Sequence, residues 1–142
     1  MFFNREKNDN KKDNLTKIAA LLIHAAKIDQ NFSPLEEDII KQTMMKLGSK
    51  EENVEQLMLV AKKIEQDSNQ ILDFTKKVKN MNEADKVQII EALWKIIYSN
   101  NDADIYETNL MRRLGGLLYI DDRIIGDIKN KIKNKVLNDL SS

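Results

Sequence analysis

The stretch that decides the fold reads Leu15-Thr-Lys-Ile-Ala-Ala-Leu-Leu-Ile-His-Ala-Ala26, and Lys86-Val-Gln-Ile-Ile-Glu-Ala-Leu-Trp-Lys-Ile-Ile97 repeats its pattern in the second half of the chain. The offset between them is half the length of the chain, so that Ile18 falls on Ile89 and Leu22 falls on Leu93. In both stretches apolar residues recur at the i, i+3, i+4, i+7 spacing of a helix that buries one face. The chain therefore holds two copies of one helical unit, each built around a central apolar helix.

Shorter amphipathic runs follow each central helix, over residues 35–47 and 54–64 in the first copy and 106–117 and 125–136 in the second. One more run, over 71–78, lies between the copies. No run of alternating β-branched residues is bounded by turn signals, so no sheet is expected. The sequence predicts an all-α fold, a compact bundle of about seven helices with an internal pseudo-twofold duplication.

The periodicity also divides the chain. Residues 1–13 hold little that a core can bury, and we expect a mobile polar arm there. Residues 14–142 then form a single domain, whose two repeats span about 14–66 and 85–138 and are joined by a linking helix.

The composition limits which classes of protein this chain can belong to. The 142 residues are 42% hydrophobic, which is enough for one cored domain, and their charges cancel to a formal net charge of zero. Without cysteine the chain has no disulfide and no thiolate chemistry. No segment is a membrane span, so we expect a cytoplasmic protein. The lysines of the last helix alternate along it and so do not share one face, which predicts no nucleic-acid partner.

Two acidic corners follow the central helices. In the second, Asn100, Asp102 and Asp104 place oxygen atoms at alternate positions of a loop, and Glu107 returns one helical turn later. Hard divalent cations such as calcium, magnesium or manganese prefer such oxygen ligands. The pattern is not an EF-hand, since that loop requires a glycine and a glutamate where this chain has Ile105 and Met111.

The first corner carries Asp29, Glu36 and Glu37. Ser33 with Glu36 three residues later is also the signature of a capped helix start, as is Asp104 with Glu107. Capping alone would select these pairs, but it does not account for Asp29, Asn100 or Asp102. These three residues favour a cation or the basic side chain of a partner.

These residues carry a family resemblance. The stretches 20–29 with 32–37, and 92–98 with 102–114, resemble the tellurite-resistance protein B (TerB-like) family, with Met111-Arg-Arg-Leu114 among the matching residues. The resemblance implies an all-helical domain with internal pseudo-twofold symmetry. It implies further a bacterial stress-response protein with clustered acidic residues that bind metal. Such proteins usually read Asp-Gly where this chain has Asp29-Gln30 and Asn100-Asn101.

Together these observations predict a non-enzymatic interaction or adaptor module in stress response. Its metal ligands would be Asp102, Asp104, Glu107, Asn100, Asp29, Glu36 and Glu37, and its partners would be proteins. The alternative is a metal-dependent enzyme that uses the paired carboxylates to activate water. A weaker third possibility is a nucleic-acid binder that uses the basic last helix. His24, the only histidine, is expected to pack or hydrogen-bond, and Gly115-Gly116 is expected to mark a close helix contact.

Overall fold

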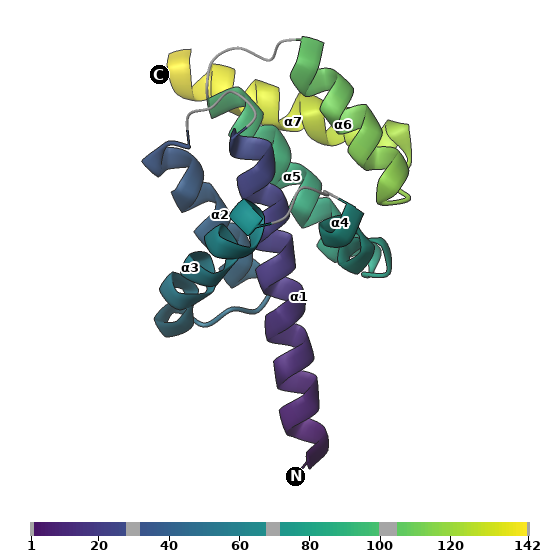
Figure 1. Ribbon diagram of the computed structural model, residues 1–142. Coiled ribbons are helices and arrows are strands. Elements are labelled where there is room, and N and C mark those ends of the chain that lie inside the picture. Colours follow the sequence, from purple (N-terminus) through teal and green to yellow (C-terminus); the bar gives the residue numbers. More distant parts are fainter. Residues whose placement is uncertain (1, 28–31, 68–71, 100–104, 142) are drawn as a thin grey trace.

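The computed structural model describes residues 2–27, 32–67, 72–99 and 105–141, with side chains over 13–27, 32–67, 74–99 and 111–135. These residues form seven helices and no strand, which confirms the predicted all-α bundle (Figure 1). The helices are α1 (Phe2–Ala26), α2 (Pro34–Lys46), α3 (Glu51–Asp67), α4 (Leu72–Lys79), α5 (Glu83–Ser99), α6 (Ile105–Leu117) and α7 (Asp122–Ser141).

The duplication appears in the bounds of the helices. Moved by half the length of the chain, α2 coincides with α6 at both ends, and the first residue of α3 falls on the first residue of α7. The central helices α1 and α5 overlap after the same shift but differ at both ends, and they pack against each other. Helix α4 is the linking helix between the copies.

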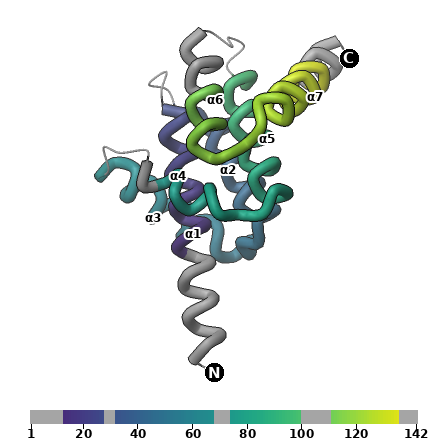
Figure 2. Tube along the Cα trace, turned by 90° about the vertical axis from the view of Figure 1, so that its right-hand side faces the viewer, coloured from purple at the N-terminus to yellow at the C-terminus, as the bar shows by residue number. Residues whose placement is uncertain are grey.

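The two copies share one core. Helix α1 packs against α2, α3, α4 and α5, while α5 packs against α7 and also against α2 of the other copy (Figure 2). The predicted central residues Ile18, Leu22, Ile89 and Leu93 are all fully buried. Because α2 bridges the copies, neither three-helix unit completes its own core.

Helix α4 makes the two halves unequal. It lies against α1 of the first copy and against α6 of the second. Helix α2, the counterpart of α6, instead packs on the central helices α1 and α5. Helices α2 and α6, which the two acidic corners precede in the sequence, therefore stand in different surroundings.

The start of the first helix differs from the prediction. Helix α1 begins at Phe2, whereas the periodicity placed its start at residue 14 and made residues 1–13 an arm. Periodicity detects only the part of a helix that buries a face, and the first described buried residue of α1 is Leu15. A charged stretch can be helical without leaving such a signal in the sequence.

The same turn ends α2 and α6. In each copy an amide donates to a carbonyl oxygen five residues earlier, from Ser49 to Met44 at 2.9 Å and from Ile120 to Gly115 at 3.0 Å. This hydrogen bond closes a helix end in which one residue takes the left-handed conformation. The two copies are therefore alike down to these backbone hydrogen bonds.

Candidate acidic site at the start of helix α2

The first acidic corner leads into the capped start of helix α2. The Oγ of Ser33 accepts a hydrogen bond from the amide of Glu36 at 3.1 Å, and the Oε1 of Glu36 accepts one from the amide of Ser33 at 2.9 Å. Pro34 occupies the first turn, where its missing N–H costs nothing. The predicted capping box is confirmed.

Only one of the two carboxylate oxygens of Glu36, Oε1, takes part in the cap. Glu36 is 0% exposed, and among the described residues its Oε2 has no hydrogen-bond partner. Burying a charged oxygen without a partner is expensive, so such an atom normally meets a donor or a cation. A carboxylate oxygen is a ligand that Ca²⁺, Mg²⁺ and Mn²⁺ accept, so Glu36 fits the predicted site.

Glu37 already has cationic partners. Its Oε1 lies 2.7 Å from the Nζ of Lys62 and 4.0 Å from that of Lys41. Lys62 also lies over the ring of Phe32, 5.7 Å from its centroid. The pKa of Lys41 is raised, first by its hydrogen bond with Glu55 and also by the nearby charge of Glu37. A cation that recruited Glu37 would compete with Lys62.

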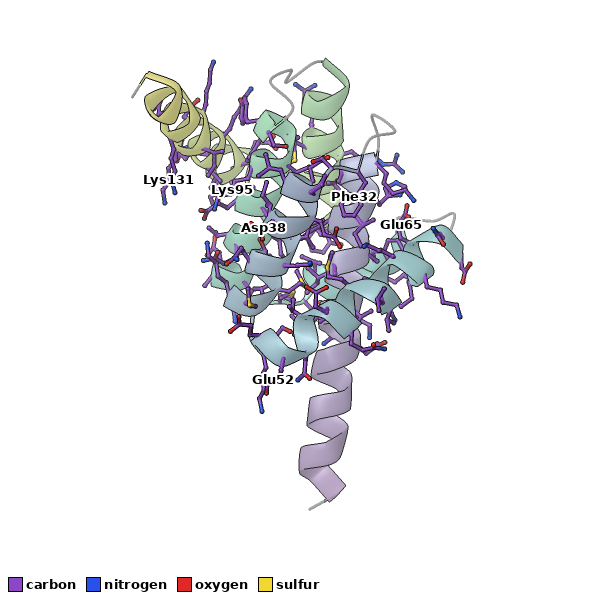
Figure 3. All side chains as sticks on the ribbon, turned by 90° about the vertical axis from the view of Figure 1, so that its left-hand side faces the viewer. Phe32, Asp38, Glu52, Glu65, Lys95 and Lys131 are labelled. Carbon is purple, nitrogen blue, oxygen red and sulfur yellow. The ribbon has the colours of Figure 1, made fainter. Side chains whose placement is uncertain are left out.

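A buried carboxylate on α3 fixes the end of α1 beside this corner. Glu65, 8% exposed, receives a hydrogen bond from the Nζ of Lys27 at 2.8 Å, and its Oε1 lies 3.3 Å from the Nδ1 of His24. Figure 3 labels Phe32 and Glu65 at this end of α2 and α3. The prediction that His24 makes a hydrogen bond is confirmed, whereas the role of Glu65 was not predicted.

The remaining predicted ligands lie beyond what the structure describes. Asp29, Asn100, Asp102 and Asp104 are outside the described residues, and Glu107 is described only through its backbone in the first turn of α6. Across the described side chains, no three histidine, aspartate or glutamate groups gather into a cation site.

These features define a small all-α domain made of two copies of a three-helix unit, with an acidic corner ahead of the second helix of a copy. The family model described as tellurite resistance protein TerB matches residues 15–130, and the chain belongs to this family. No curated protein and no solved structure matches the chain. Among the described helices, none has the length and apolar character needed to cross a membrane.

Proposed function

We propose that this chain is a non-enzymatic TerB-family interaction module whose two acidic corners bind divalent cations such as calcium, magnesium or manganese. The observation that carries the proposal is the buried Oε2 of Glu36, which lacks a partner among the described residues. A cation would satisfy this oxygen, and Asp29 of the same corner would supply a second carboxylate.

The charges around the corner support the proposal. Lys27 is paired with Glu65 at 2.8 Å, and Lys62 is paired with Glu37 at 2.7 Å. Both lysines are thus held by other carboxylates, and no ion pair joins Glu36 to a lysine that the structure describes. The start of α2 offers only the partial positive charge of a helix N-terminus. The corner therefore retains negative charge for an incoming cation.

We further propose that cation occupancy organises the corners for a protein partner. The first corner joins the end of α1 to the start of α2, and α2 packs on both α1 and α5. A cation that binds only the folded corner stabilises this arrangement by mass action. Glu36 contributes binding charge to the site, and the proposal involves no chemical step.

Exchanging Glu36 for glutamine separates ligation from capping. Glu36→Gln keeps an oxygen for the amide of Ser33, since glutamine also serves in a capping box. Without a cation the variant should be at least as stable as the wild type, because a buried charge is removed. A cation at a hundred times its dissociation constant should stabilise the wild type by about 2.7 kcal/mol, and the variant by less. Thermal melts with and without Ca²⁺, Mg²⁺ or Mn²⁺ measure this.

Glu37→Gln is the matched control for this experiment. It removes a neighbouring carboxylate that pairs with Lys62, and it should leave most of the cation response in place. Equal cation responses in the wild type and Glu36→Gln would contradict a ligand role for Glu36.

The second corner should be the stronger cation site. Asp102, Asp104 and Glu107 offer three carboxylates, and affinity for hard cations rises with ligand charge. The double variant Asp102→Asn, Asp104→Asn should therefore lose most of the cation-dependent rise in melting temperature, whereas Asp29→Asn should lose less. Equal losses in the two proteins would rule out this ranking.

A further inference from the structure

Tyr119 occupies a backbone conformation that the first copy gives to a glycine. Its φ is 56°, and Gly48, its counterpart in the first copy, has a φ of 118°. Both residues sit in the repeated turn that ends α2 and α6. A side chain in the left-handed region strains the backbone, and glycine does not. The second copy thus tolerates a strain that the first avoids.

Burial of the ring does not compensate for this strain. Tyr119 is 68% exposed, the highest fraction among the large hydrophobic side chains found exposed in the described residues. Its described ring contact is with Lys79 at the end of α4, whose Nζ lies 4.7 Å from the ring centroid. An exposed contact of this kind is weak. A strained and exposed aromatic residue points to a role outside the core.

The ring borders a pocket. A cavity of about 250 Å³ is lined by Glu83, Lys86 and Val87 of α5 and by Tyr119 and Ile120 of the turn between α6 and α7. Figure 1 shows this turn beside the start of α5 and α4. The pocket is separate from the acidic corner, since none of its lining residues belongs to that site.

The pocket has one lysine and one glutamate in its lining, Lys86 and Glu83, and Lys79 lies at its border over the ring of Tyr119. Within the described part of the chain, neither Lys79 nor Lys86 lies within ion-pair distance of a carboxylate. Val87, Ile120 and the ring of Tyr119 supply the apolar surface. Glu83 adds a carboxylate, which accepts a hydrogen bond from a peptide N–H and repels a simple anion, and the two lysines outnumber it. The chemistry of this lining fits a carboxylate next to an apolar side chain on a peptide.

We propose that this pocket binds a short segment of a partner protein, in which a carboxylate meets Lys86 and Lys79 and an adjacent aromatic or aliphatic side chain packs on Tyr119. The carboxylate belongs either to the C-terminus of the partner or to an aspartate or glutamate side chain. This inference rests on the proposed function as an interaction module, and it locates the partner's docking site away from the cation sites.

The test is an NMR titration of the full chain, labelled with ¹⁵N, with three probe peptides. Acetyl-Gly-Phe carries a terminal carboxylate, acetyl-Asp-Phe-amide carries a side-chain carboxylate, and acetyl-Gly-Phe-amide carries none. We expect saturable shifts of the amides of Val87, Tyr119 and Ile120 with at least one acidic peptide. Its affinity should exceed that of the neutral peptide by about tenfold, as expected for a charged hydrogen bond. Which acidic peptide binds more tightly identifies the source of the carboxylate.

Two variants make the test specific. Lys86→Gln should lower the affinity for the acidic peptide several-fold, whereas Lys63→Gln, which changes an exposed lysine of α3, should leave this affinity unchanged. Tyr119→Gly should lose the peptide shifts while its melting temperature stays equal or rises, because glycine relieves the strained φ. Shifts that are absent, that the neutral peptide reproduces, or that survive in Tyr119→Gly would overturn the proposal.

A failure here can be told apart from a failure of the cation proposal. The peptide titration is repeated with and without Ca²⁺, and the melts of the same samples report cation binding. Loss of the peptide shifts with an intact cation response rejects only the pocket. The reverse result rejects only the cation site.

Discussion

Replacing Trp94 with alanine is expected to lower the free energy of unfolding by about 3–5 kcal/mol, the usual loss for a buried aromatic residue. Trp94 is 2% exposed and joins α5 to α7. Its Nε1 donates a hydrogen bond to the carbonyl oxygen of Ile125 at 3.2 Å. Its ring stacks on Tyr98 with 6.0 Å between centroids and lies 5.4 Å from the Nζ of Lys129. The variant loses all these contacts at once and leaves a cavity.

Trp94→Phe is the control that separates the contribution of ring packing from that of the hydrogen bond to Ile125. It keeps an aromatic ring in the core and removes the hydrogen bond to Ile125, which contributes about 1 kcal/mol, so its total loss should be well below that of alanine. Urea unfolding should be followed by circular dichroism, since Trp94 is the only tryptophan and its fluorescence disappears in both variants. Equal losses in the two variants would show that the ring packs loosely.

Adding one methyl group at Gly115 should make the protein less stable than adding it at Gly116, by about 1–3 kcal/mol. A β-carbon at Gly115 would collide with the Cδ1 of Ile125, a buried side chain of α7. A β-carbon at Gly116 meets no atom within 4 Å. Both glycines lie in the last turns of α6, so the gain in helix propensity, up to about 1 kcal/mol, nearly cancels between the two variants.

The comparison of Gly115→Ala with Gly116→Ala needs only two urea titrations. Gly116→Ala should be as stable as the wild type or more so, while Gly115→Ala forces Ile125 to move. Two variants of equal stability would mean that α6 and α7 separate easily. They would also reject the prediction, drawn from the Gly115-Gly116 pair, of a close helix contact at this point.

Much of the fold could be predicted from the sequence because burial leaves a periodic trace. The apolar positions of the central helices, such as Ile18 and Ile89, revealed both helix type and duplication. The start of α1 at Phe2 left no such trace, because the residues before Leu15 offer no apolar periodicity. The left-handed Tyr119 was also missed, since turn signals favour glycine or asparagine there. Comparison with Gly48, its counterpart in the first copy, was the signal that would have revealed it.

The candidate site was less accessible to sequence reasoning. Local spacing was enough to predict the capping box of Ser33 and Glu36, because both partners belong to one helix turn. The pairing of Glu65 with His24 and Lys27 depends on how α3 lies against α1, and no local spacing encodes that approach. The same holds for the pairing of Glu37 with Lys62, which engages one of the predicted ligands with a lysine.

The linking helix α4 also has a consequence for how the two halves of the gene can change. Two identical subunits in a symmetric dimer must carry the same residue at corresponding positions, so every substitution appears twice. One continuous chain is free of that constraint, because each half is encoded separately. Position 48 can keep its unstrained glycine while position 119 accepts a tyrosine, over whose ring Lys79 of the linking helix lies. Because the copies are joined in one chain, corresponding positions can take different residues and different roles, which a symmetric dimer of identical subunits would not allow.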